Sequence, residues 1–252
     1  MRPAPESSFD DLACDYDRHR VGYADELYDA LEEYGLGRGQ RVLDVGCGTG
    51  LASVALAARG CSIVGVDSSE PMLVRARERV PAAHFLRAHA ENLPFADAGF
   101  DGAVCAQAFP WFDQPRALRE LTRVVRPGGA VGIWWQALMR GDTTRLLREE
   151  VAQSLGGLAT PIELAAQDFE VFESSPLLDR RLRIVPWVVH TTAGDFLVYE
   201  RSRKRARDAF GDACDIYLAR LAERLGAPQA PLVVSYVHFL YLGRVAAAEP
   251  VR

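Results

Sequence analysis

Three glycines, Gly46, Gly48 and Gly50, are the residues of this sequence best suited to hold a ligand, and they follow a short apolar run at 42–45. A glycine turn lets a ligand approach the backbone closely, because glycine has no Cβ and tolerates positive φ. The alanine-rich stretch 51–58 predicts a helix behind the turn, whose first N–H groups have no partner within the helix. Leu51 stands where a dinucleotide-binding fingerprint has its third glycine, so the spacing argues against a nicotinamide-dependent oxidoreductase.

A second group that could bind a ligand is Asp67, which ends an apolar run at 62–66 and lies 21 residues after Gly46. At the end of a strand beside a glycine loop, a carboxylate can accept hydrogen bonds from both hydroxyls of a ribose. The alternative is a local role, because Asp67, Ser68 and Ser69 are all good N-caps for a helix at 70–79. Both interpretations remain open from the residues alone.

The elements that must position these residues follow from short apolar runs that alternate with helical spacings. Such alternation forms a parallel sheet with right-handed crossovers. We predict strands at 41–45, 62–67, 83–87, 102–106 and 131–135, and helices at 7–18, 23–35, 50–59, 70–79 and 114–125.

The pattern changes after residue 136. The run 232–242 is strongly β-like and suits an antiparallel strand added to the sheet. We expect helices at 142–156, 161–168 and 195–225, the last broken near Gly211, and extended segments at 169–174 and 182–189. The expected organisation of residues 1–252 is one domain, with an N-terminal helical lid at 1–36, a cofactor-binding core at 37–136, a substrate cover at 137–230 and a last strand at 231–243.

Further motifs agree with one family. The segment HAENLPF at 89–95 follows the third strand, FDGAVCAQAFPWFD at 100–113 contains the fourth, and RVVRPGG at 123–129 precedes the fifth. With the loop DVGCGTG, they resemble the motifs of class I S-adenosylmethionine-dependent methyltransferases, in particular the type 11-like family that acts on small molecules. The resemblance covers residues 14–135. It implies an α/β fold with a Rossmann-like, seven-stranded, mostly parallel sheet, an antiparallel last strand, helices on both faces and a helical cover.

The resemblance also assigns parts of the cofactor to segments of the chain. Tyr16 and Arg20 would touch its methionine end, although Val21 stands where the family usually has proline. Ala90 and Glu91 would face the adenine ring. The expected cofactor-binding residues are Tyr16, Arg20, Asp44, Gly46, Cys47, Gly48, Thr49, Gly50, Asp67, Ser68, Met72, Ala90, Glu91, Asn92, Gln107 and Ala108.

The acceptor substrate is expected at the carboxyl ends of the fourth and fifth strands, where open α/β sheets collect ligands. Aromatic side chains there exclude water and tolerate a nearby cation. We expect Phe109, Trp111, Phe112 and Trp135 to line the substrate, with core packing as the alternative for Trp135 and its neighbour Trp134.

Pro110 departs from the family pattern, because related small-molecule enzymes often have histidine there and proline cannot act as a general base. Either the acceptor already carries a nucleophilic carboxylate, amine or enol carbon, or another residue is the base. His190 is that candidate, whereas His238 is expected to pack in the core. The sequence after the fourth strand lacks Asn-Pro-Pro-Tyr, which disfavours N-methylation of bases or glutamine amides.

Composition narrows the partners. The net charge of −5 argues against nucleic acid, and the arginine-rich run 201–207 is expected to form one solvated helix face. Five scattered cysteines without a CxxC pair predict a reducing compartment and no metal site. With no signal-like N-terminus and no run of 18 apolar residues, we expect a cytoplasmic protein without membrane contact. Arginine supplies nearly all the positive charge and Lys204 is the only lysine, a composition typical of high-GC codon usage, so we expect a bacterial source.

Three functions therefore stay open. The expectation is methyl transfer to a small molecule, such as a natural-product intermediate. A methyltransferase acting on RNA or protein is less favoured by the acidic balance. The third function is a protein of this fold that binds S-adenosylmethionine but senses it or catalyses another reaction, because fold does not determine function. The oligomeric state is left open.

Overall fold

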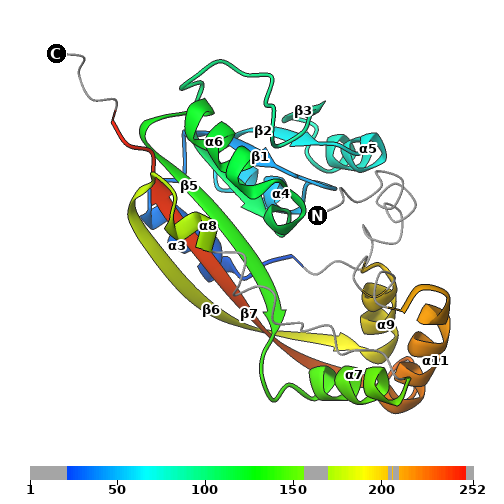
Figure 1. The fold of residues 1–252 in the computed structure, drawn as a ribbon. Coiled ribbons are helices and arrows are strands. Elements are labelled where there is room, and N and C mark those ends of the chain that lie inside the picture. Colours follow the sequence, from blue (N-terminus) through cyan, green and yellow to red (C-terminus); the bar gives the residue numbers. More distant parts are fainter. Residues whose placement is uncertain (1–21, 156–169, 204–205, 207–209, 248–252) are drawn as a thin grey trace.

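Seven strands form the central sheet, in the order β3-β2-β1-β4-β5-β7-β6 (Figure 1). The computed structural model describes residues 22–155, 170–203, 206 and 210–247, so the helices expected at 7–18 and 161–168 lie outside the described residues, as do Tyr16 and Arg20. Neighbouring strands from β3 to β5 pair in parallel, and β7 runs antiparallel to β5 and β6. The predicted fold class is confirmed. The strands are β1 Arg41–Val45, β2 Ser62–Asp67, β3 His84–Arg87, β4 Phe100–Ala106, β5 Val125–Leu138, β6 Leu178–Thr192 and β7 Pro231–Arg244.

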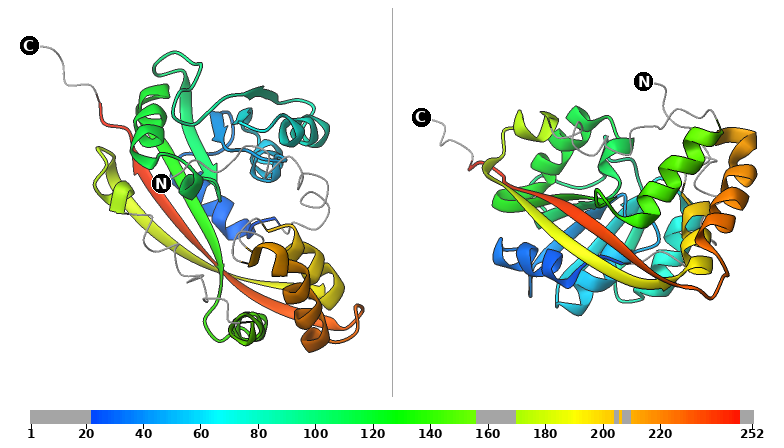
Figure 2. Two further views of the ribbon diagram at one scale, coloured as in Figure 1. Left: turned by 45° about the vertical axis from the view of Figure 1, so that its right-hand side comes forward. Right: turned by 90° about the horizontal axis from the view of Figure 1, so that it is seen from below.

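Helices cover both faces of the parallel part of the sheet (Figure 2). Apolar side chains of α3 and α4 pack on one face, and those of α6 and α8 pack on the other. The helices are α3 Asp25–Glu33, α4 Leu51–Ala58, α5 Glu70–Arg79, α6 Gln114–Val124, α7 Thr143–Ser154, α8 Glu170–Glu173, α9 Ala193–Arg201 and α11 Cys214–Leu225, with short 3₁₀ turns η1 Phe109–Trp111 and η3 Gly211–Ala213.

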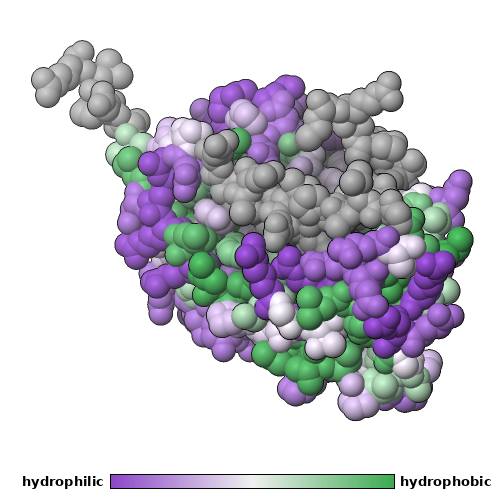
Figure 3. Space-filling view, turned by 60° about the horizontal axis from the view of Figure 1, so that its bottom comes forward, coloured by the Kyte–Doolittle hydropathy of each residue, from purple (hydrophilic) through white to green (hydrophobic). Residues whose placement is uncertain are grey.

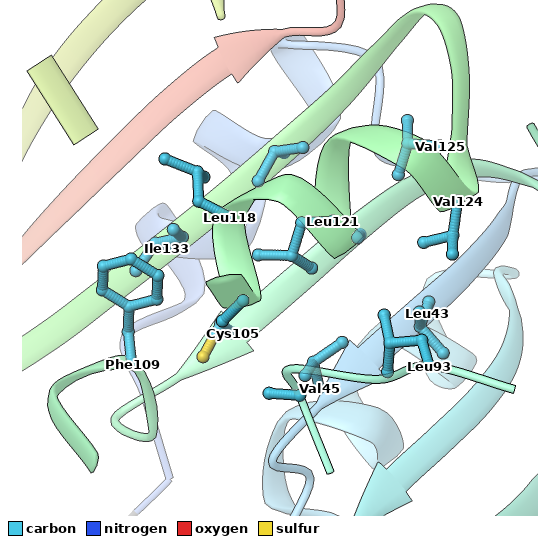
Figure 4. Packing of buried hydrophobic residues seen from close by; sticks show 14 of the residues in the cluster. Leu43, Val45, Leu93, Cys105, Phe109, Leu118, Leu121, Val124, Val125 and Ile133 are labelled. Atoms are coloured by element: carbon cyan, nitrogen blue, oxygen red, sulfur yellow. The ribbon is translucent and has the colours of Figure 1, made fainter. Parts of the chain in front are cut away.

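The core follows from the period-two alternation of the strands, which sends successive side chains to opposite faces. In β1, Leu43 and Val45 face α6, whereas Val42 packs with α3 and α4. Figure 4 shows Leu43 and Val45 in the same apolar cluster as Leu118 and Leu121 of α6. Asp44 therefore points to the α4 face, at the end of the strand that leads into the glycine loop.

Of two expectations for the region after residue 136, one is confirmed and one needs correction. The segment expected to be extended at 182–189 is extended, as part of β6, which is the edge strand of the sheet and pairs along β7. The segment expected to be extended at 169–174 contains the single helical turn α8 instead. Phe172 of this turn is 1% exposed and packs edge-on against Tyr241 of β7, with a centroid distance of 5.7 Å. Burial of that ring decides the conformation, not the local alternation.

The β6–β7 ribbon extends beyond the end of β5. The last β5–β7 pair is Leu138 with Tyr236, while β6 and β7 stay paired as far as Thr192 and Pro231. α7, α9 and α11 gather at this end (Figures 1 and 2), where they share an apolar cluster with Tyr236. Figure 3 shows the face that contains this end, where apolar and polar side chains are interspersed.

Candidate functional site

The glycine loop wraps around the carboxyl end of β2. Gly46, Gly48 and Gly50 all have positive φ, at 69°, 53° and 80°. The amides of Gly46 and Cys47 both donate to the Val66 carbonyl, at 2.8 and 3.0 Å. The predicted tight turn between β1 and α4 is therefore present, with its backbone tied to the neighbouring strand.

Gly46 allows the glycine loop to touch the segment that follows β4. A Cβ at position 46 would lie 2.4 Å from the Ala108 Cβ and 2.9 Å from Cζ of Phe112. At Gly48, by contrast, a Cβ would meet no atom within 4 Å. The loop thus packs on the post-β4 segment at one glycine and presents open backbone at the next, as a ligand cradle requires.

Asp67 holds this open backbone in place. Its Oδ2 accepts a hydrogen bond from the Gly48 amide at 2.8 Å, and its Oδ1 accepts one from the Ser69 amide at 2.9 Å. The N-cap of α5 is Ser69, whose hydroxyl accepts from the Met72 amide. Of the three residues that could cap this helix, Ser69 is therefore the N-cap, and Asp67 supports it by accepting the hydrogen bond from its amide. Its contact with a ribose stays a prediction.

Asp44 is the most unusual group of the site. It is fully buried, its Oδ2 accepts a hydrogen bond from the Ser53 hydroxyl of α4 at 2.6 Å, and its Oδ1 has no partner in the described part of the chain. Burial raises the pKa of Asp44 to about 7, although the bond from Ser53 opposes the shift. A buried carboxylate oxygen without a donor is costly, so the site fits a ligand that brings positive charge or a hydrogen-bond donor.

The other predicted cofactor residues of the loop region turn their side chains into the protein. Cys47 packs against Phe85 and α5, and burial raises the pKa of its thiol well above the usual range. Thr49 is 1% exposed, and its hydroxyl accepts from Arg79 at 2.9 Å. Met72 is also buried. Cys47 and Thr49 therefore present main-chain atoms to any ligand. Ser68 is half-buried.

The segment expected to face adenine is tied to α6. Ala90 is buried in the core, and a backbone bridge pairs His89 with Asn92. The Glu91 carboxylate accepts a hydrogen bond from the Asp113 amide at 2.8 Å, at the N-cap of α6. This contact fixes Glu91 beside the post-β4 segment, and its role toward adenine stays a prediction.

The structure separates the residues expected to line the substrate. Phe109 is 1% exposed and lies in the core beside Ile133 (Figure 4), so it supports the site from inside and offers no surface to an acceptor. Trp111 is 36% exposed, and Phe112 is half-buried against Gly46. Trp135 is buried to 8% exposure, on the α6 face.

Gln107 connects this region to the end of β5. It has a positive φ of 62°, its amide donates to the Trp134 carbonyl at 3.0 Å, and its side chain donates to Oε1 of Gln136 at 3.3 Å. Trp134 is 1% exposed and packs edge-on against Tyr23 and Tyr28, so its core alternative is the one that the structure shows.

The two histidines differ as the sequence suggested, but His190 is displaced from the glycine loop. His238 is fully buried in contact with Trp187, and burial lowers its pKa to about 4. His190 is exposed on the edge strand, paired with Val233 beyond the end of β5. By strand alternation it lies on the sheet face opposite to Trp187. Its role as a base stays a prediction.

A charged cluster that the sequence did not predict lies at the end of the β6–β7 ribbon. Arg148 of α7 and Arg203, two residues after α9, both pair with the fully buried Glu200. The arginine-rich run 201–207 is therefore not one solvated face, because Arg203 points inward. The i, i+3 spacing of Glu200 and Arg203 was the only local signal, and none marked Arg148.

Two negative findings apply to the described residues. They contain no group of three histidine, cysteine, aspartate or glutamate side chains that could hold a metal ion. Among the described helices, none is both long and apolar enough to cross a lipid bilayer.

The glycine loop lies within a segment that matches a known family model. Residues 43–133 match the family model described as a methyltransferase domain. An uncharacterized methyltransferase of Mycobacterium bovis is 38% identical over 128 residues, which are 51% of this chain and 51% of that protein. A malonyl-[acyl-carrier protein] O-methyltransferase of Pseudescherichia vulneris is 40% identical over 162 residues, covering 58% of this chain and 64% of that protein. The chain thus spans about half the length of the first curated relatives it matches.

The same fold occurs in solved structures. One from Anaeromyxobacter dehalogenans, named as a type II methyltransferase, superposes with a TM-score of 0.63 at 22% identity, covering 98% of this chain and 99% of that one. At this identity the likeness concerns the fold alone.

Proposed function

We propose that this chain is a class I S-adenosylmethionine-dependent methyltransferase, which transfers a methyl group from S-adenosylmethionine to a small-molecule acceptor. The match of residues 43–133 to the model of a methyltransferase domain and the likeness to the mycobacterial methyltransferase support this proposal. The observation that carries the proposal is the pair formed by the open backbone at Gly48 and the unpartnered buried oxygen of Asp44. Together they offer a close approach to the main chain and a buried acceptor for a cationic ligand.

The residues of the chain would bind and orient the reactants. When bound, S-adenosylmethionine would supply a sulfonium methyl group to the nucleophile of the acceptor, and the electron pair of the broken C–S bond would stay on the sulfur of the leaving S-adenosylhomocysteine. Gly48 and Asp67 would hold the nucleoside, and Asp44 would oppose the positive charge. Phe112 and Trp111 would exclude water near the reaction. Orientation of this kind can contribute about 7–11 kcal/mol to catalysis.

For the acceptor, we propose a biosynthetic intermediate that carries its own nucleophile, such as a carboxylate. Proline at position 110 provides no base there, and a carboxylate nucleophile leaves no proton to remove. The name of the Pseudescherichia relative, an O-methyltransferase, supports the same class. The net charge of −5 favours a small molecule over nucleic acid, with cytoplasmic bacterial metabolism as the proposed setting.

The test has a binding arm and a reaction arm. Calorimetry with S-adenosylmethionine should give one site, and methyl-labelled cofactor should then transfer its label to members of a panel of carboxylic acids, phenols and amines. S-adenosylhomocysteine should form in equal amount. Absence of binding would refute the proposal. Binding of S-adenosylmethionine without formation of S-adenosylhomocysteine for any acceptor would favour the alternative, a protein that senses the cofactor or uses it without methyl transfer.

A further inference from the structure

A pocket lies at the carboxyl end of β5, between this strand and the helices at the end of the ribbon. It contains aromatic, amide and guanidinium groups, contributed by four separate parts of the chain. Its lining residues are Trp135, Gln136, Ala137, Leu138, Arg148, Tyr199, Arg203 and Tyr236.

The two arginines that line the pocket and the glutamate that pairs with them do not balance in charge. Arg148 Nη2 lies 2.8 Å from Oε1 of Glu200, and Arg203 Nη1 lies 3.0 Å from the same oxygen. The side chains of Glu200, Arg148 and Arg203 are 0%, 7% and 17% exposed. In the described part of the chain, neither guanidinium pairs with a second carboxylate. Two cations and one anion thus leave one net positive charge in a buried place.

Such an arrangement is expensive unless something completes it. Removal of a charge from water is unfavourable, and an ion pair offsets this cost only when its groups are fully paired. Each guanidinium has five N–H donors, so one carboxylate that is shared by two guanidinium groups cannot accept from all their donors. The Tyr199 ring, 5.9 Å from the Arg203 guanidinium carbon, adds only a weak cation–π contact. An anion is the ligand that would neutralise the cluster.

A chain of contacts connects this pocket to the glycine loop. Gln136 lines the pocket and accepts the hydrogen bond from Gln107 at the end of β4. The next residue, Ala108, is the one that Gly46 approaches most closely. The pocket is therefore placed on the acceptor side of the proposed cofactor site.

We propose that Arg148 and Arg203 bind a carboxylate of the acceptor molecule, and so select anionic acceptors. This inference rests on the proposed function. Guanidinium groups suit the role, because their planar fork matches a carboxylate with two parallel hydrogen bonds. Glu200 holds both arginines in position, and the aromatic side chains of Tyr199 and Tyr236 provide the walls.

The cluster could instead only connect helices, since Arg148 also reaches the Tyr217 hydroxyl of α11 at 3.4 Å. The variant Arg203→Gln separates the two roles. It leaves Glu200 paired with Arg148 as a neutral pair, so the fold should be retained while the net positive charge is lost. Arg224→Gln is the matched control, because Arg224 also lies in this region but forms an exposed pair with Glu150.

The experiment titrates malonate into the full chain by calorimetry, with and without S-adenosylhomocysteine, and uses malonamide as the uncharged counterpart. Wild type and Arg224→Gln should bind malonate, while malonamide should bind at least tenfold more weakly. Arg203→Gln should lose at least tenfold in malonate affinity and keep its affinity for S-adenosylhomocysteine. Malonate should also raise the melting temperature of the wild type and not that of Arg203→Gln.

Several results would overturn the inference. These are the absence of malonate binding to the wild type, equal binding of malonamide, or unchanged malonate affinity in Arg203→Gln. A parallel loss of S-adenosylhomocysteine affinity would show that the pocket receives the carboxylate of the cofactor, not that of the acceptor. If Arg203→Gln does not fold, Arg203→Lys decides, with a loss of threefold or more expected and an unchanged affinity contradicting the proposal. If S-adenosylhomocysteine does not bind, the proposed function is refuted. The titration of malonate without S-adenosylhomocysteine tests the anion site separately.

Discussion

Cofactor binding should release a proton from Asp44, and this is the sharpest consequence of the site geometry. Without ligand, burial raises the pKa of Asp44 to about 7, so the carboxyl is half protonated at pH 7. Among its charged neighbours, Asp67 is the other carboxylate, and its charge also raises the pKa of Asp44. Tyr28, Cys47 and Cys105 stay neutral in this range, because burial raises the pKa of each.

A cationic ligand beside the unpartnered oxygen favours the ionised form, so binding and proton release are linked. If only ionised Asp44 binds, affinity rises about tenfold per pH unit below pH 7 and levels off above it, a gain of about thirtyfold from pH 5.5 to pH 8. About half a proton should be released per molecule bound at pH 7.

Calorimetry with S-adenosylmethionine in buffers of different ionisation enthalpy measures both quantities. Asp44→Asn should weaken binding of S-adenosylmethionine at pH 8 by about tenfold and remove the pH dependence of the affinity. The control Asp212→Asn changes an exposed residue and should keep the wild-type affinity and its pH dependence. An affinity for the wild type that does not change between pH 5.5 and 8 would refute the reasoning. So would a pH slope that persists in Asp44→Asn.

The same pKa predicts the stability of the ligand-free protein. The pKa of Asp44 is higher in the folded state than its unfolded value near 4. The contribution of Asp44 to the free energy of unfolding is therefore most favourable below pH 4 and is lost as pH rises through 7. At pH 8, Asp44→Asn should therefore be more stable than wild type, by at most about 4 kcal/mol from a shift of about three units. Urea denaturation at pH 5 and pH 8 measures the difference, and a destabilised variant at pH 8 would contradict it.

Three further substitutions test other parts of the site. Asp67→Ala removes the acceptor of the Gly48 amide and should weaken cofactor binding at least tenfold in calorimetry; unchanged affinity would exclude the ribose assignment. Gly46→Ala should destabilise the fold by about 1–3 kcal/mol and reduce cofactor affinity, because its Cβ would overlap Ala108, and the added change Ala108→Gly should recover part of the stability in urea denaturation. A double variant without any recovery would argue against that clash. His190→Ala should lower turnover with little change in cofactor affinity, whereas full activity would remove this exposed histidine as the base.

Local sequence was enough for the parallel core. The turn between β1 and α4 depends on three glycines within five residues of the chain, and the strands β1 to β5 follow from short-range apolar periodicity. Asp67 could be placed at the rim of this turn because the carboxyl ends of neighbouring parallel strands meet at one edge of the sheet. These features need no knowledge of distant contacts.

The tertiary structure alone decided how the remaining side chains are used. Whether Phe109 faces a ligand or the core depends on β5 and α6. The conformation of α8 depends on the ring of Tyr241, which lies on β7. Arg148 and Glu200 form an ion pair across more than fifty residues, which no local pattern encodes. In the same way, the sequence shows Asp44 only as one acidic residue in a motif. The structure shows that it is buried against α4, where one carboxylate oxygen has no partner among the described residues. Local geometry determines where the glycine loop forms, but burial by distant elements determines which of its charges carry chemistry.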